Sequence, residues 1–155
     1  RLQRNVLVEV TNRLPQTCEA FGSDLRVKAV ATGLYTYPDV SIICGSAIYA
    51  DKRKDTITNP TVLVEVLSPS TEAYDRGRKF QHYQTIPSLK EYLLVSQTEM
   101  RVERFTRAGD DSWMLRSYTG KDAALPIEAV GIVVPLEAIY QRVEFEETSE
   151  TRQPL

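Results

Sequence analysis

The chain has 155 residues, and its 19 basic and 21 acidic side chains give a formal net charge of −2. Apolar residues make up 42% and charged residues 26%, the proportions of an ordinary globular protein. This balance excludes binding to nucleic acid through overall charge, so such binding would need a local basic patch. The chain has no apolar run of about 18 residues, and we expect no membrane span.

The length predicts a single domain over residues 1–145. Arg1 already lies inside a helical pattern, so we expect the natural chain to begin before it. The polar, acidic residues 146–155 predict a disordered tail.

The two cysteines, Cys18 and Cys44, have no metal-binding spacing. Cys44 ends an apolar run, which predicts a small core residue. We see no signal peptide, and we therefore expect a reducing, cytoplasmic location.

Hydrophobic periodicity predicts the elements in chain order. A helix reaches about Leu14 and ends at Pro15, and alternation predicts a strand at 25–30. The remaining expected elements are strands at 40–44, 61–67 and 90–96, a helix at 72–85, a hairpin of 101–107 with 112–118, and a closing helix within 133–143. This order predicts an α/β (α+β) fold with a central mixed sheet flanked by helices.

Two of these strands each contain one acidic residue in apolar surroundings. Period two places Asp39 on a face with Ser41 and Ile43, and Glu65 on a face with Leu63 and Leu67. If the strands are neighbours, Asp39 and Glu65 converge. Two converging carboxylates repel, and a shared proton or a hard cation such as Mg²⁺ relieves the repulsion.

The helix that follows the second acid adds an amine. Asp75, Lys79 and Tyr83 are spaced four residues apart and share one helical face. The helix starts a few residues after the strand and should fold back across it. Lys79 is therefore a candidate partner of the carboxylates, able to hold a water or stabilise charge at phosphorus.

The segments "YPDVSIIC", "NPTVLVEVLSPST" and "DRGRKFQHYQTIPSLKEYLLV" together resemble a bacterial endonuclease family of the PD-(D/E)XK superfamily. The resemblance covers about residues 25–96 and implies the restriction-endonuclease-like fold. It also implies a nuclease dependent on Mg²⁺ or Mn²⁺ that cleaves phosphodiester bonds, with DNA as the expected substrate. The ordered combination is specific, whereas the PD dipeptide alone carries little weight.

Carried over by residue, the resemblance implies that Asp39 and Glu65 are catalytic metal ligands and that the Val66 carbonyl completes the set. In the parent superfamily a lysine lies two positions after the second acid, where this chain has Leu67. The branch resembled here places its lysine on the next helix, which implies Lys79. Glu9 on the first helix is the accessory candidate, together with Asp75 and Tyr83.

Simpler interpretations stay open for single residues. Asp39 could be a turn residue after Pro38, and Glu65 could form a buried structural ion pair with Lys79 or Arg76. Asp75 could merely pair with Lys79, and Tyr83 could merely pack. The segment "DKRKD" at 51–55 reads as a solvated loop or as a local patch that touches phosphates.

Two other functions also stay open for the whole chain. One is an inactive oligomerising or regulatory module that keeps the fold, and the other is a hydrolase of small phosphate esters. The alternating strands of the expected hairpin leave an edge for pairing, so we expect a homodimer.

Overall fold

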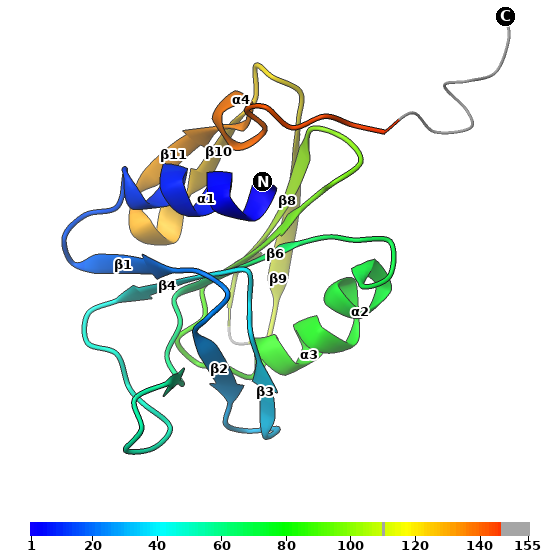
Figure 1. The fold of residues 1–155 in the computed structure, drawn as a ribbon. Helices are drawn as coiled ribbons and strands as arrows, with labels where there is room; N and C mark the ends of the chain where they lie inside the picture. Colours follow the sequence, from blue (N-terminus) through cyan, green and yellow to red (C-terminus); the bar gives the residue numbers. More distant parts are fainter. Residues whose placement is uncertain (110, 147–155) are drawn as a thin grey trace, which may run out of the picture.

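A six-stranded mixed sheet forms the centre of the computed structural model, which describes residues 1–109 and 111–146 (Figure 1). In spatial order its strands are β1 (Cys18–Phe21), β4 (Val40–Cys44), β6 (Val62–Val66), β7 (Glu91–Val95), β8 (Arg101–Arg107) and β9 (Trp113–Thr119). Within the described residues of this six-stranded sheet, β6 and β7 pair in parallel and the other neighbouring strands pair antiparallel. The predicted mixed sheet is confirmed.

The parallel pair β6 and β7 requires a crossover, which two short helices supply. They are α2 (Glu72–Arg76) and α3 (Arg78–Gln84), and they lie together beside the sheet (Figure 1). The prediction of one helix over 72–85 is wrong, because the chain breaks at Gly77, with φ −103° and ψ −96°. A Cβ at this position would lie 3.1 Å from the Ala73 carbonyl oxygen, so the tight break suits glycine.

Each face of the sheet packs against its own core. On one face lie α1 (Leu2–Thr11), α4 (Leu136–Ile139) and the hairpin of β10 (Ala124–Ile127) and β11 (Ile132–Pro135), joined by the 3₁₀ turn η1 (Glu128–Val130). On the other face lie α3 and a small three-stranded sheet of β3 (Leu34–Thr36), β2 (Arg26–Ala29) and β5 (Thr56–Ile57). Ile42 and Val64 belong to the first core, while Ile43 and Leu63 belong to the second. The central strands are therefore apolar on both sides.

The helices at both ends of the chain are shorter than expected. α1 ends at Thr11 rather than near Leu14, although Leu2, Val6 and Val10 are buried at the expected helical spacing. The predicted closing helix is present only as α4, because residues 133–135 before it pair with β10 as part of β11 and the helix ends at Ile139. In the described residues, 1–109 and 111–146, no helix combines the length and apolarity needed to cross a membrane. The expected tail at 147–155 lies outside the described residues.

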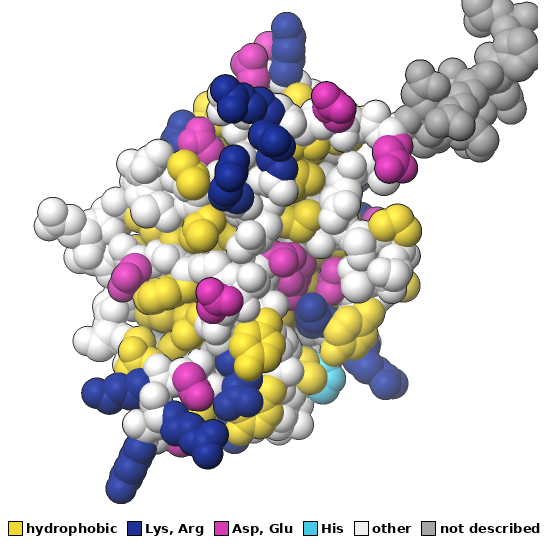
Figure 2. All heavy atoms as spheres, viewed as in Figure 1, with side chains coloured by type: hydrophobic (Ala, Val, Ile, Leu, Met, Phe, Trp, Pro, Cys, Tyr) yellow, Lys and Arg dark blue, Asp and Glu magenta, His cyan; other side chains and the backbone are white. Residues whose placement is uncertain are grey.

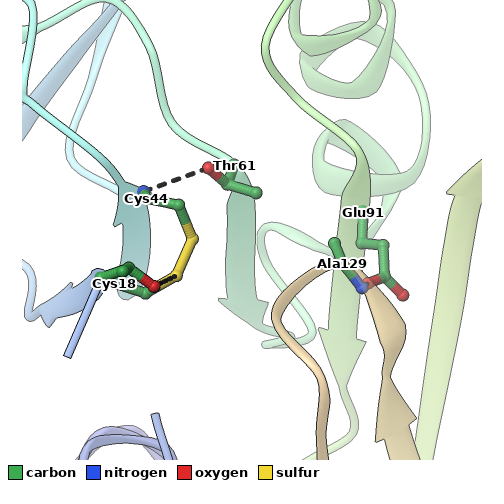
Figure 3. Close-up of a disulfide and its surroundings, with 6 residues drawn as sticks. Cys18, Cys44, Thr61, Glu91 and Ala129 are labelled. Carbon is green, nitrogen blue, oxygen red and sulfur yellow. Dashed lines mark hydrogen bonds between the residues drawn. A yellow bond between two sulfur atoms is a disulfide. The ribbon is translucent and has the colours of Figure 1, made fainter. Parts of the chain in front are cut away.

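The cysteines are joined, contrary to the interpretation of Cys44 as an isolated core residue. Cys18 of β1 and Cys44 of β4 lie opposite each other in the antiparallel register and form a disulfide (Figure 3). The register brings together residues separated by 26 positions, which linear spacing does not reveal. Such bonds persist in oxidising compartments and are rare in the cytosol, so the cysteines no longer support a reducing location.

Candidate active site

Glu65 lies in β6 at the centre of a buried hydrogen-bond cluster. Its side chain is 4% exposed, and Oε2 accepts hydrogen bonds from Lys79 Nζ and from the Tyr83 hydroxyl, both at 2.9 Å. Oε1 accepts a bond from the backbone N–H of Asp39 at 3.3 Å. The carboxylate in this apolar strand therefore has three donors, two from helix α3 and one from the segment just before β4.

Asp39 immediately precedes β4, the antiparallel neighbour of β6 in which Val40 lies opposite Val64. Its Oδ2 accepts a hydrogen bond from the Val66 backbone N–H at 2.7 Å. Asp39 and Glu65 thus approach each other through reciprocal contacts with backbone groups. The structure brings the two sequence-predicted acids together, as expected from their positions on neighbouring strands.

Lys79 and Tyr83 come from α3, and Asp75 comes from α2. Lys79 Nζ lies 3.1 Å from Asp75 Oδ1, and both side chains are largely buried. The break between α2 and α3 therefore does not separate Asp75 from Lys79. The Tyr83 hydroxyl also hydrogen-bonds to Thr36 Oγ1 at 2.7 Å, which links the cluster to β3.

Arg76, the other proposed ionic partner of Glu65, lies in a different network. Its guanidinium forms ion pairs with Glu103 of β8 and with Glu72. It thereby lowers the pKa of the Glu103 carboxyl through hydrogen bonding. Lys79 is the cation that contacts Glu65.

Burial sets the protonation behaviour of the cluster. Loss of water raises the pKa of Glu65 to about 7, and repulsion from Asp39 adds to this, while Lys79 and Tyr83 oppose it. Burial also raises the pKa of Asp39, partly offset by the Val66 N–H. Burial lowers the pKa of Lys79, but the carboxylates of Glu65 and Asp75 outweigh this effect. The pKa of Lys79 therefore lies above its ordinary value. A bound proton or an added cation would therefore relieve the buried charge of Glu65 near neutral pH.

A cleft of about 590 Å³ opens beside Asp39 and Val66. The start of α1 forms one side, where Gln3 donates its side-chain N–H to the Asp39 carbonyl at 3.0 Å. Arg142, after α4, and Gln97, after β7, also line the cleft. Sequence reasoning missed these residues, since none of them belongs to a recognisable motif.

Glu9, the accessory candidate on α1, does not line this cleft. It pairs with Arg13 one turn further along the helix, at 3.5 Å. It lies almost two turns from Gln3, the α1 residue that contacts the Asp39 segment. Glu9 lies on the expected helix, α1, but its ionic partner is Arg13 and neither residue lines the cleft.

The donors around the cleft suit a weakly held hard cation. Among residues 1–109 and 111–146 no group of three or more His, Cys, Asp or Glu side chains is arranged to hold a metal. The carboxylates of Asp39 and Glu65 supply oxygen donors, and the two acids repel each other. Mg²⁺ commonly binds through one or two carboxylates and completes its shell with water and substrate phosphate. The set therefore fits Mg²⁺ or Mn²⁺ but not a closed structural site.

The fold of this chain matches that of a solved protein structure. Over 90% of this chain and 78% of the other, the structure matches a crystal structure from Anabaena variabilis described as a putative nuclease belonging to DUF820, with a TM-score of 0.72. Sequence identity is 17%, so this likeness shows the fold alone. The fold is restriction-endonuclease-like, as the sequence resemblance implied.

The family follows from the sequence itself. Residues 1–137 match the family model described as "Uma2: Putative restriction endonuclease", and the chain belongs to the Uma2 family. Two curated relatives come from a Synechocystis strain, and both are described as uncharacterized proteins. The first, slr1290, is 42% identical over 83% of this chain, and the second, sll1609, is 39% identical over 69%. The chain spans 66% and 60% of their respective lengths.

Proposed function

We propose that this chain hydrolyses phosphodiester bonds in DNA with the help of Mg²⁺ or Mn²⁺. Asp39 and Glu65, with the Val66 carbonyl, are the proposed metal ligands, and Lys79 is the proposed catalytic amine. Family membership supports the nuclease class. The carboxylate of Glu65 carries the proposal, because it is buried yet contacts both the Asp39 segment and Lys79.

A structural ion pair alone explains this arrangement less well. Replacing a buried ion pair with apolar residues is often neutral or stabilising, so packing gives little reason to place four ionisable side chains here. The group consists of Asp39, Glu65, Asp75 and Lys79, and of these four Asp39 lines the open cleft. Clusters with perturbed pKa values beside a cleft are candidates for catalysis.

The chain's own residues divide the chemical tasks. A divalent cation held by the two acids would supply Lewis-acid polarisation of the phosphate and would acidify an attacking water. Lys79 orients that water or stabilises negative charge that develops on phosphate oxygens. Asp75 holds the Lys79 amine in place, and Tyr83 fixes the orientation of Glu65.

The test compares Glu65→Gln with wild type in assays of Mn²⁺ binding and plasmid cleavage. Glutamine keeps the size of the side chain but removes its charge and replaces one of its two acceptor oxygens with an NH2 donor. We expect loss of saturable Mn²⁺ binding by calorimetry and loss of cleavage, with an unchanged circular dichroism spectrum. Glu19→Gln, on the exposed face of β1, is the matched control and should retain both activities.

The other two functions predict different results. An inactive module binds no Mn²⁺ in either protein and cleaves nothing. A hydrolase of small phosphate esters turns over small esters, and its substrate affinity changes little with salt. A DNA enzyme loses affinity steeply as the salt concentration rises. Full cleavage by Glu65→Gln contradicts the proposed site.

Cytoplasmic location and homodimer formation remain proposals. In a reducing cytoplasm Cys18 and Cys44 would be facing thiols rather than a disulfide. The edge strand β9 is the proposed dimer contact, since β9 ends the order of the central sheet.

A further inference from the structure

Two exposed tyrosines lie on the segment that leads into the candidate site. From Tyr35 to Val40 the side chains alternate between outward and buried positions. Tyr35 and Tyr37 are 46% and 59% exposed, whereas Thr36 between them is buried against Tyr83. Tyr37 stands two residues before Asp39, on the short segment that joins β3 to β4, and the chain bends at Asp39. At most about 7 Å of chain separates Tyr37 from Asp39, and at most about 14 Å separates Tyr35 from it.

Strand β2 places two cations beside these rings. Lys28 lies opposite Tyr35 in the antiparallel register, and Arg26 follows on the same face. The Arg26 guanidinium lies 4.5 Å and the Lys28 ammonium 5.2 Å from the centroid of the Tyr35 ring. Arg26 also lies 3.9 Å from the Asp55 carboxylate and donates a hydrogen bond to Thr56, whereas Lys28 takes part in none of the ion pairs found among the described residues. We call these four residues, Arg26, Lys28, Tyr35 and Tyr37, the tyrosine face.

The charge around the tyrosine face differs from that of the whole chain. Residues 25–37 and 46–58 contain five basic and two acidic residues, in a protein whose net charge is −2. Three of the five are Lys52, Arg53 and Lys54, all exposed in the loop before β5, which pairs with β2. Figure 2 shows basic and hydrophobic side chains gathered over β2 and β3, below the carboxylates at the centre of this face.

We propose that the tyrosine face binds a single-stranded segment of nucleic acid beside the phosphate to be cleaved. Bases stack on Tyr37 and Tyr35, while Lys28 and Arg26 contact phosphates. This inference rests on the proposed function, because the tyrosine face lies on the segment that leads to Asp39. Exposed aromatic rings between cations are the usual platform for unpaired strands.

The rings select a single strand over a duplex. A base stacks on a tyrosine only when its own face is free, and duplex bases are already stacked on their neighbours. Cations alone would bind either form through phosphates. The combination of tyrosines with cations therefore points to unpaired nucleotides, such as a flap, a gap or a locally melted end.

The binding test uses a fluorescently labelled single-stranded oligodeoxythymidine, the intact chain and EDTA, which prevents cleavage. Stacking contributes about 1 to 3 kcal/mol per base, so Tyr37→Ala should weaken binding by about 5-fold to 150-fold in fluorescence anisotropy. Tyr37→Phe keeps the ring and should bind like wild type. Tyr49→Ala is the matched control: Tyr49 pairs with Ile57, lies on the opposite face of the small sheet and is 41% exposed.

Salt dependence separates the rings from the cations. Each phosphate contact on a single strand contributes about 0.7 to the slope of log affinity against log salt. Lys28→Gln should reduce the slope by about that amount, whereas Tyr37→Ala should leave it unchanged. Circular dichroism and melting of each variant verify the fold.

Several outcomes overturn the proposal. They are equal affinity of Tyr37→Ala and wild type, an equal loss in Tyr49→Ala, or an equal effect of Tyr37→Ala on duplex binding. A change of mass in Tyr37→Ala by light scattering, without a change in affinity, would instead assign the face to a second copy. Because binding is measured without metal, these results are independent of cleavage by the Glu65 variants. Failure of the nuclease proposal and failure of this surface are therefore distinguishable.

Discussion

The Lys79 ammonium and the Glu65 carboxylate are 2.9 Å apart, although one side chain comes from α3 and the other from the central strand β6. The crossover that connects two parallel strands carries Lys79 back over the end of β6. A lysine fourteen positions after the acid in the sequence thus contacts it directly. Leu67, at the usual lysine position, is buried in the core instead.

Substitution of Lys79 distinguishes the contribution of the lysine charge from that of a bound metal ion. Lys79→Met should reduce cleavage by about 100-fold to 1,000-fold, as expected when a group that stabilises developing charge is removed. It should also lower stability by roughly 3 kcal/mol, because two buried carboxylates lose their cation. Added Mn²⁺ should recover part of this stability, as a second cation replaces the first. Cleavage assays and urea unfolding with and without Mn²⁺ measure both effects, and exposed Lys90→Met is the control.

Stability of the metal-free protein should depend on pH through Glu65. Its pKa is about 7 in the folded protein and 4.5 ordinarily, so the folded state holds this proton more tightly. The resulting stabilisation is fully present below pH 4.5 and is lost as pH rises through 7. Relative to Glu65→Gln, wild type should therefore lose up to roughly 3 kcal/mol over this window. Parallel unfolding curves for both proteins across the window would refute the assignment.

Removal of the disulfide should destabilise the protein without affecting the site directly. Cys18 and Cys44 close a loop with a separation of 26 residues. The double variant Cys18→Ser with Cys44→Ser should lose about 3 kcal/mol in urea unfolding, mainly because its unfolded chain is freer. Dithiothreitol should lower the stability of wild type to the same level and leave the double variant unchanged. Insensitivity of wild type to the reductant, with both thiols open to labelling, would mean that the pair is not bonded.

The predicted homodimer has a defined test at strand β9. Met114 and Leu115 on β9 are 61% and 53% exposed, beside a free sheet edge. Leu115→Lys should convert a dimer to a monomer in light scattering, since it places charge in an apolar contact. Val133→Lys alters an equally exposed residue of β11, 55% exposed, and should leave the mass unchanged. A monomeric wild type would remove the prediction.

Local patterns predicted β2, β4, β6, β7, β8 and β9, but they missed the shorter strands β1, β3, β5, β10 and β11 and predicted the helix ends poorly. Strand 40–44 is found with the expected limits, Asp39 directly precedes it, and Glu65 lies in the neighbouring strand. The prediction of one helix over 72–85 is wrong at Gly77, where the backbone leaves the helical conformation. The helical spacing of side chains continues past this residue, so the pattern does not reveal the break. Glu9 was placed by resemblance and lies by Arg13, whereas the cleft is reached by Gln3. Which residue of a helix contacts a cleft depends on how the helix packs against the sheet, and a local sequence pattern does not contain that information.

The amino-acid sequence alone determined the two acids, their faces and the amine on the next helix, because side-chain direction follows the strand and helix periods. Only the tertiary structure decided that Cys18 meets Cys44, that Lys79 rather than Arg76 reaches Glu65, and that two cations lie beside Tyr35. These relationships depend on strand register and on the path of the crossover. Both are set by burying two separate cores against one sheet, and burial is a property of the whole chain.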